Sequence, residues 1–237
     1  RPFLSNGVPP RFKKHDRGFI RWLHWTRRQV DYLSDEDLER IRSGDRLREL
    51  YDLVVFPGHS EYVTEQAYDV VERYRDLGGN LLFLSANNFF WKVERRGREI
   101  RRVGLWRNLG RPESRLIGVQ YVANDDGSVQ RPFAVRNAAA LRWLWEGTGL
   151  GEGDTFGEFV GGFGTEIDAV SRHSPRGTVV AAEIVDIFGP GRTAQMAYYE
   201  TPAGARVFAA GALDFGGAVT FWPMRRMLEN IWRHLSV

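Results

Sequence analysis

Two apolar stretches decide the expected fold: Tyr51-Asp-Leu-Val-Val-Phe-Pro-Gly58 and Asn80-Leu-Leu-Phe-Leu-Ser85. Each is a short, nearly continuous apolar run, which is typical of a strand buried on both faces of a sheet. Residues 64–77 lie between them with helical periodicity, Thr64 as a cap and Gly78-Gly79 as the stop. Because a strand, a helix and a strand with short connections form a βαβ unit, the two strands are expected to be parallel. The sequence therefore predicts an α/β fold with helices on both faces of a parallel sheet.

Other elements are predicted outward from this unit. The apolar periodicity indicates helices over 17–30, from a Ser34 cap to Arg42, over 136–146 and over 224–235, and strands over 30–33, 178–188, 194–200 and 206–212. Residues around 91–135 form a β-rich excursion with a hairpin turn at Arg96-Gly97-Arg98, and the glycine-rich residues 147–164 indicate a loop. No internal repeat or low-complexity linker occurs, so residues 1–237 are interpreted as a single domain.

The composition excludes several classes of function. The chain contains no cysteine, which excludes disulfides, thiolate metal sites and cysteine nucleophiles. Its 33 basic and 30 acidic residues are interleaved and no nucleic-acid motif occurs, so we expect no nucleic-acid partner. No run of about 18 apolar residues is present, so no membrane span is expected. The chain begins with Arg1, which leaves targeting open, and a cytoplasmic location is favoured.

Polar residues follow both apolar stretches, and these residues are the candidate site. Gly58-His59-Ser60-Glu61-Tyr62 follows the first stretch and Ser85-Ala86-Asn87-Asn88 completes the second. In open parallel sheets the functional crevice lies at the carboxyl ends of the strands, so we expect the two segments to meet there. An imidazole and a carboxylate two residues apart can act on one reacting atom or one metal ion. The alternative is a loop histidine bonded to backbone and a glutamate that complements a helix dipole.

We predict three catalytic residues and four residues lining the substrate pocket. The catalytic residues are His59, Glu61 and Asn87. The pocket residues are Tyr62, Asn88, Trp91 and Glu166. Glu166 lies with Asp168 beyond a glycine loop that can fold over a crevice, although salt-bridge or capping roles are the simpler interpretation for these two acids.

The other histidines and a glycine-rich run are weaker candidates for a functional site. His24 and His234 fall in helical patterns and His173 in a loop, so structural or solvated roles are expected for all three. The Gly161-Gly162-Phe163-Gly164 run lacks the lysine of a phosphate-binding loop and is rejected as one.

Four stretches of the chain resemble a known family. Residues 51–62, 78–91, 111–118 and 205–211 look like the C-terminal domain of the N,N-dimethylformamidase large (beta) subunit. The resemblance implies a class I glutamine-amidotransferase-like sheet with flavodoxin-like topology. In enzymes of that wider fold a nucleophile, usually cysteine, stands after the strand that corresponds to Asn80–Ser85, and this chain has asparagine there.

The resemblance also implies a metal site. Dimethylformamidase holds a mononuclear iron with two tyrosines and a glutamate beside a histidine, and its His-x-Glu pair falls on His59 and Glu61, so Glu61 is the implied metal ligand. Residues 1–31 contain no tyrosine where the family has its ligands, which leaves Tyr32, Tyr51 and Tyr62 as substitutes. Further N-terminal sequence or a partner subunit would otherwise have to supply them, and a homo-oligomer is expected.

Two functions from different classes remain open. One is hydrolysis of a small-molecule amide, with Glu61 as metal ligand or base and His59 as proton shuttle. The other is a non-catalytic binding or assembly module. It would be directed at carbohydrate, because the fold also resembles the trehalose-utilisation family and because Trp91 and Trp106 flank the expected crevice.

Overall fold

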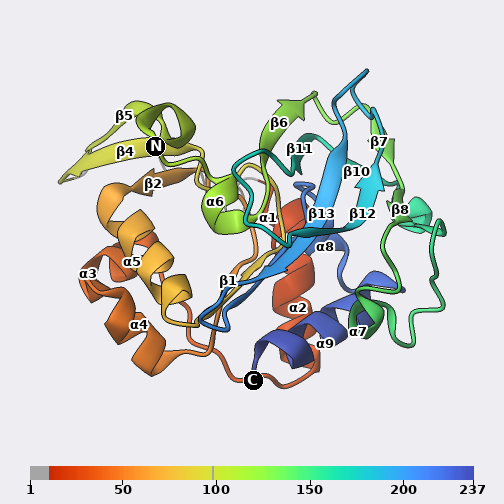
Figure 1. The fold of residues 1–237 in the computed structure, drawn as a ribbon, viewed down its shortest axis with the longest axis horizontal. Coiled ribbons are helices and arrows are strands. Elements are labelled where there is room, and N and C mark those ends of the chain that lie inside the picture. Colours follow the sequence, from red (N-terminus) through yellow and green to blue (C-terminus); the bar gives the residue numbers. More distant parts are fainter. Residues whose placement is uncertain (1–10, 98) are drawn as a thin grey trace.

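The chain folds around a mixed seven-stranded β-sheet (Figure 1). A computed structural model describes residues 11–97 and 99–237. In spatial order the strands of the sheet are β1 (Leu53–Phe56), β3 (Asn80–Phe83), β14 (Arg206–Ala209), β13 (Ala194–Glu200), β12 (Val179–Ile184), β8 (Phe133–Val135) and β9 (Thr155–Phe156).

The sheet is parallel on one side only. β1, β3 and β14 are parallel, whereas the pairings from β14 through β13, β12 and β8 to β9 are antiparallel. The prediction of a parallel pair is confirmed for the βαβ unit. The additional strands predicted over 178–212 join the same sheet, and β13 pairs with β14 in antiparallel orientation. The reason is the length of the connections: residues 201–205 join β13 to β14, and so short a segment cannot make the crossover that a parallel pair needs.

Helices cover both faces of the sheet, as predicted. Along β3, Leu81 and Phe83 point to one hydrophobic core and Leu82 points to the other, because successive side chains of a strand alternate between faces. The first core is covered by α5 (Glu65–Asp76) together with α3 (Asp35–Ile41), α4 (Gly44–Leu50) and α6 (Ser114–Ile117). The second core is covered by α2 (Arg17–Trp25) and α9 (Met224–Leu235), which Figure 1 shows below the sheet.

For the βαβ unit, the predicted helix cap is confirmed and the predicted burial of the first strand is wrong. α5 begins at the predicted Thr64 cap, whose hydroxyl accepts the Ala67 N–H at 3.3 Å, so that prediction is confirmed. β1 was expected to be buried on both faces, but all four of its residues are only half-buried. β1 contacts both cores but is the edge strand of the sheet, which leaves one of its sides open.

Smaller sheets extend from the carboxyl side of β1 and β3. They consist of β2 (Tyr62–Thr64), β4 (Trp91–Arg96) and β5 (Glu99–Leu105); of β6 (Gln120–Asn124) and β11 (Glu166–Ala169); and of β7 (Gln130–Arg131) and β10 (Phe163–Gly164). The predicted hairpin is confirmed, because β4 and β5 are antiparallel and Arg96 pairs with Glu99. Arg98 of its turn lies outside the described residues.

Several predicted boundaries need correction. Residues 30–33 form no strand, and α2 ends at Trp25 because Arg27 takes a left-handed conformation with φ of 52°. The helix predicted over 136–146 is reduced to α7 (Arg142–Trp145), which follows another left-handed residue, Asn137. α4 was not predicted. The remaining short helices are α1 (Phe12–His15), α8 (Phe215–Ala218) and the 3₁₀ turns Trp106–Leu109 and Glu158–Val160.

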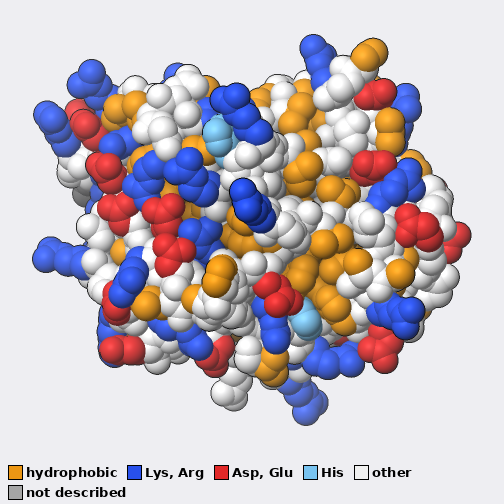
Figure 2. Space-filling view, viewed as in Figure 1, with side chains coloured by type: hydrophobic (Ala, Val, Ile, Leu, Met, Phe, Trp, Pro, Cys, Tyr) orange, Lys and Arg blue, Asp and Glu red, His pale blue; other side chains and the backbone are white. Residues whose placement is uncertain are grey.

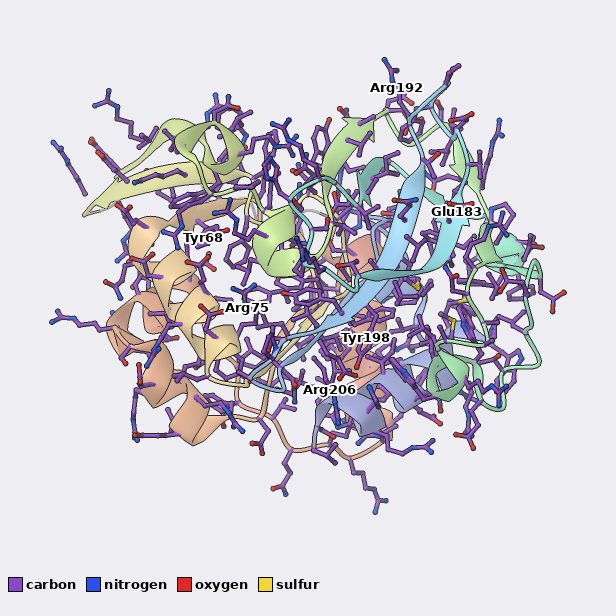
Figure 3. The ribbon with its side chains drawn as sticks, viewed as in Figure 1. Tyr68, Arg75, Glu183, Arg192, Tyr198 and Arg206 are labelled. Carbon is purple, nitrogen blue, oxygen red and sulfur yellow. The ribbon has the colours of Figure 1, made fainter. Side chains whose placement is uncertain are left out.

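The capping prediction at Ser34 and the helix over 224–235 are confirmed. Figure 3 labels Tyr198 and Arg206, which face α9 from the sheet. The Tyr198 hydroxyl lies 2.8 Å from Nε2 of His234, and Arg206 donates to the His234 carbonyl. His234 is therefore a structural residue, as expected from its helical position.

On the face shown in Figure 2, basic and acidic side chains are mixed with apolar ones. None of the helices in the described part of the chain is long and apolar enough to cross a bilayer.

Candidate functional site

The loops that follow β1 and β3 are bonded to each other at the carboxyl edge of the sheet. The Asn88 side-chain oxygen accepts the Ser60 N–H at 3.1 Å, and the Phe89 N–H donates to the Ser60 carbonyl at 2.8 Å. The Glu61 carbonyl accepts the N–H groups of Phe90 and Trp91. The two loops are parallel neighbours because β1 and β3 are paired, so their side chains emerge at the same edge.

The side chains of His59, Glu61, Asn87, Glu166 and Asp168 meet at this edge, and we call them the His59 cluster. His59 Nε2 lies 3.1 Å from Oε2 of Glu166 and 3.9 Å from Oε2 of Glu61. Asn87 Nδ2 donates to Glu166 at 2.8 Å and to Glu61 at 3.3 Å. Thus Glu166 contacts both His59 and Asn87, and Asn87 also bonds to Glu61, so the three residues predicted to be catalytic lie together with the predicted pocket residue Glu166.

The backbone holds Asn87 in the position that makes this bridge. Asn87 has φ of 54°, in the left-handed region that asparagine adopts more readily than most residues. Its N–H donates to Oδ1 of Asp168 at 2.8 Å. Asp168 is buried on β11, two residues after Glu166. One strand therefore supplies both the carboxylate that accepts the Asn87 N–H and the carboxylate that contacts His59.

The charges of the His59 cluster shift the pKa values of its two glutamates in opposite directions. Burial alone would lower the pKa of His59, but Glu166, Glu61 and Asp168 outweigh it and raise that pKa. Burial likewise opposes ionisation of Glu166, but the hydrogen bond from His59 holds the pKa of Glu166 below its usual value. Both shifts favour the charged forms, an imidazolium at His59 and a carboxylate at Glu166.

The other two carboxyl groups are shifted in the opposite direction. Burial raises the pKa of Glu61, and repulsion from Glu166 adds to it, while His59 opposes the shift. Burial raises the pKa of Asp168 to about 7, with further repulsion from Glu113 and Glu166. One imidazole therefore faces three carboxyl groups, and two of them hold their protons more tightly than usual.

The other predicted pocket residues have different positions. Asn88 is turned toward the Ser60 backbone and is buried, so it positions the loop rather than lining the cluster. Tyr62 lines a separate pocket of about 360 Å³ with Ser60 and Phe89, although its hydroxyl lies close enough to Glu61 to lower the pKa of that carboxyl. Trp91 is half-buried with the Arg102 guanidinium 4.8 Å from the centre of its ring.

Trp106, expected beside a crevice, is 1% exposed and packs against Tyr68 in the core. His24 is exposed on α2 and His173 lies in a loop, and neither joins the His59 cluster.

Sequence reasoning missed Asp16, which lies beside the cluster. A Cβ atom at Gly58 would stand 2.1 Å from Asp16 Oδ1, so a larger residue before His59 would have to displace the Asp16 carboxylate. Burial raises the pKa of Asp16, while His15 and His59 oppose the shift. Gly58 was the available signal, but a glycine after a strand predicts a turn and does not identify which side chain approaches it.

The described residues do not fit a two-tyrosine iron centre. Tyr32 and Tyr51 line a surface depression with Leu50 and Asp31, and that depression does not include Glu61. Tyr62 is the one substitute tyrosine that reaches the Glu61 carboxyl. Tyr121 lies near the cluster, but its hydroxyl donates to Asn124 at 2.5 Å.

Within residues 11–97 and 99–237, no group of three or more His, Asp or Glu side chains is arranged to hold a metal ion. A hard carboxylate ligand is present at Glu61, but the set of phenolates that iron would need is not assembled around it. The iron site implied by the resemblance is therefore not supported by these residues.

The fold and the cluster define an α/β protein with a histidine–carboxylate site at the carboxyl edge of its parallel strands. A model of the family "N,N-dimethylformamidase beta subunit-like, C-terminal" matches residues 1–227, and the chain belongs to that family. The expected family is thus confirmed over nearly the whole chain. A search of curated proteins gave no match.

Proposed function

We propose that the chain is a hydrolase of small amides that works by general acid–base catalysis at the His59 cluster. The observation that supports this most is the divergence of two neighbouring carboxyl groups: the pKa of Glu61 is raised and that of Glu166 is lowered, with His59 between them. Environments that move the pKa values of adjacent groups apart are characteristic of acid–base sites.

Glu61 is the proposed base and His59 the proposed acid. The Glu61 carboxylate takes a proton from water, and the hydroxide so formed attacks the carbonyl carbon of the amide. When the C–N bond breaks, the Nε2–H of His59 protonates the leaving amine. The proton on Glu61 then returns to His59 across the 3.9 Å between Oε2 and Nε2, directly or through water. Glu166 keeps the imidazole oriented and cationic between turnovers.

We also infer a flavodoxin-like, class I glutamine-amidotransferase-like arrangement for the parallel strands, within a single domain. The left-handed Asn87 after β3 supports it, because a left-handed residue at that turn presents its side chain at the strand end.

The test is a small-amide panel with matched glutamine variants. Formamide, acetamide, N-methylformamide and N,N-dimethylformamide are incubated with the purified chain, and amine release is measured. We expect Glu61→Gln and His59→Gln to lower kcat/KM by about 10²–10⁴. Glu65→Gln is the control, since Glu65 is an exposed glutamate paired with Lys92 at 2.9 Å. N,N-dimethylformamide should be a poor substrate, since the two-tyrosine set is not assembled.

A metal role for Glu61 is tested separately. Elemental analysis of protein purified without chelator is compared between the wild type and Glu61→Gln, and equal metal content contradicts a ligand role. No turnover of any amide, with or without added iron, overturns the hydrolase proposal. That result would favour the binding or assembly module. A carbohydrate-directed module is disfavoured by Trp106, which is buried, and by Trp91, which Arg102 covers.

A further inference from the structure

Thr165, the residue before Glu166, has a backbone conformation that its side chain makes costly. Its φ is 64°, in the left-handed region, where a β-branched residue is a rare and strained occupant. Glycine or asparagine would adopt this conformation at less cost. The surroundings must therefore hold Thr165 in place.

The hydroxyl of Thr165 is held by a polar group of residues, which we call the Asp214 anchor. It consists of the buried His15 and Asp214, the half-buried Gln130 and the exposed Lys14. Thr165 Oγ1 donates to Asp214 Oδ2 at 3.2 Å and accepts from Gln130 Nε2 at 3.1 Å. Lys14 Nζ lies 2.9 Å from Asp214 Oδ2, and His15 Nδ1 lies 2.9 Å from Oδ1. Thr165 and Asp214 are 4% and 7% exposed.

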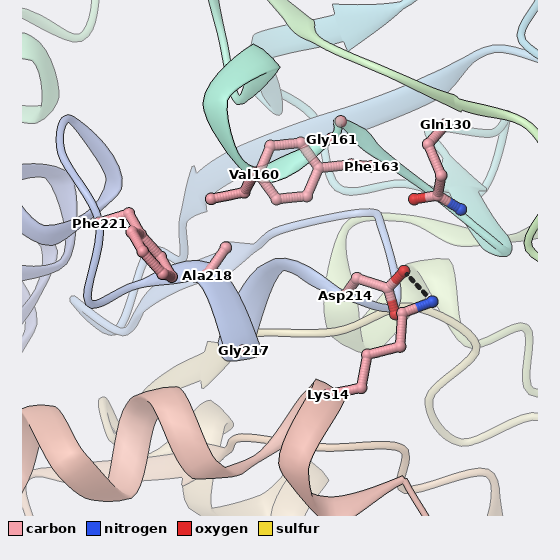
Figure 4. A pocket seen from close by; sticks show the side chains of 10 residues that line it. Lys14, Gln130, Val160, Gly161, Phe163, Asp214, Gly217, Ala218 and Phe221 are labelled. Carbon is pink, nitrogen blue, oxygen red and sulfur yellow. Dashed lines mark ion pairs between the residues drawn. The ribbon is translucent and has the colours of Figure 1, made fainter.

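The anchor also forms one wall of a pocket of about 340 Å³, in which Figure 4 shows Lys14, Asp214 and Gln130 at one end and Val160 and Phe221 at the other. The pocket lies on the side of Thr165 where its hydroxyl points, and the His59 cluster lies beyond the next residue in the chain.

Two pairs of adjacent residues, 213–214 and 165–166, join the Asp214 anchor to the His59 cluster. Asp214 binds the Thr165 side chain, and the Leu213 N–H donates to the Glu166 carbonyl at 3.1 Å. The pair 213–214 thus holds the pair 165–166, and Glu166 in turn contacts His59 at 3.1 Å and Asn87 at 2.8 Å. A change in the backbone angles of Thr165 would move the Glu166 carboxylate relative to the imidazole.

We propose that Thr165 is a positioning residue: the Asp214 anchor, acting through the Thr165 hydroxyl, holds the left-handed turn that places Glu166 against His59. A role in packing alone would not require threonine at this φ. The catalytic consequence rests on the proposed function, but the placement of Glu166 against His59 can be tested without any turnover.

The experiment compares Thr165→Gly, Thr165→Val and Thr165→Ser in the whole chain. Urea unfolding, kcat and KM on the best amide, and the ¹⁵N resonance of His59 Nε2 at one fixed pH are measured, with the resonance assigned through His59→Gln. Thr165→Gly should retain or gain stability because the strain is relieved, yet shift the His59 resonance and lower kcat at least tenfold, with KM changed less than threefold. Thr165→Val should shift the resonance in the same way, and Thr165→Ser should restore the wild-type resonance and kcat.

Thr178→Val is the matched control, because it removes a threonine hydroxyl bonded to the Pro175 carbonyl at 2.7 Å; it should leave His59 unchanged. A wild-type His59 resonance in Thr165→Val or in a folded Thr165→Gly overturns the positioning role. If Thr165→Gly does not fold, the Val and Ser variants decide. A shifted resonance with no turnover in the wild type would support the positioning role and contradict the hydrolase.

Discussion

The two polar clusters on either side of the Thr165–Glu166 peptide differ in charge balance. In the Asp214 anchor one carboxylate faces the Lys14 ammonium and the His15 imidazole. Burial raises the pKa of Asp214, but His15 and Lys14 outweigh it and hold that pKa below its usual value. In the His59 cluster a single imidazole faces three carboxyl groups, and the pKa values of Glu61 and Asp168 are raised.

The difference indicates which cluster serves stability. In a balanced group the charges compensate one another, and removing one partner leaves the buried members without theirs. An unbalanced group costs stability as long as its carboxyls are ionised, so its presence is better explained by chemistry than by folding. The two clusters share one backbone segment, which allows the balanced one to support the unbalanced one.

The largest expected effect comes from breaking the balanced cluster. Asp214→Ala removes the acceptor of Lys14 and Thr165 and leaves His15, which is 6% exposed, without its carboxylate. We expect a loss of about 2–4 kcal/mol in the free energy of unfolding, measured by urea denaturation, because the buried Thr165 hydroxyl and the buried His15 imidazole each lose a partner. Asp214→Asn keeps an acceptor for the Thr165 hydroxyl and should cost less. A loss below about 1 kcal/mol for Asp214→Ala would contradict the assignment of this cluster to stability.

A smaller effect of opposite sign is expected at Asp168. Because its folded-state pKa is raised to about 7, the folded chain binds this proton more tightly than the unfolded chain does. Stability is therefore lost as the pH rises from the unfolded pKa of about 4 through 7. Asp168→Asn removes this titration and still accepts the Asn87 N–H. Relative to the wild type, the variant should gain about 1–3 kcal/mol in unfolding free energy between pH 5 and pH 8.5.

Urea unfolding of both proteins at the two pH values measures this change, and taking their difference cancels the titration of groups that behave alike in both. The contrary outcome is that the free energies of unfolding of the variant and the wild type differ by the same amount at pH 5 and pH 8.5. In that case Asp168 is ionised at both pH values, and its carboxyl group is not destabilised by the charges around it.

Much of the fold could be predicted because its signals are local. The apolar runs of β1 and β3, the caps at Ser34 and Thr64 and the period of α9 each depend on a few neighbouring residues. The antiparallel pairing of β13 and β14 is consistent with the five residues between them, but their place beside β3 in one sheet depends on pairing between distant parts of the chain. α7 was overestimated because periodicity does not reveal the left-handed Asn137.

The candidate site could be predicted only where it follows the strands of the βαβ unit. His59, Glu61 and Asn87 come from loops whose meeting is a consequence of parallel pairing. Glu166 was expected only to line the pocket, and its contact with His59 at 3.1 Å depends on a strand more than 100 residues away in sequence. Asp214 and Asp16 carry no sequence signal of their own, because each approaches through a tertiary contact.

The smallest stability effect is expected at Glu166, and a matched residue makes it a sharp test. The side chains of Glu166 and Glu183 are both 20% exposed, but Glu183 is balanced by Arg136 at 2.8 Å, whereas Glu166 shares its surroundings with Glu61 and Asp168. Figure 3 labels Glu183 on β12, which is four strands away from β1 in the order of the sheet.

Glu166→Gln loses the ion pair with His59 but also removes a negative charge that repels Glu61 and Asp168, so the two changes offset each other. We expect it to change the free energy of unfolding by less than about 0.5 kcal/mol, whereas Glu183→Gln loses roughly 0.5–1 kcal/mol with its arginine partner. Activity should respond in the opposite order, with kcat/KM on the best amide about tenfold or more lower in Glu166→Gln and unchanged in Glu183→Gln. If Glu166→Gln proves the more destabilising of the two, the carboxyl groups around His59 are not repelling one another. The proposed difference in charge balance between the His59 cluster and the Asp214 anchor is then wrong.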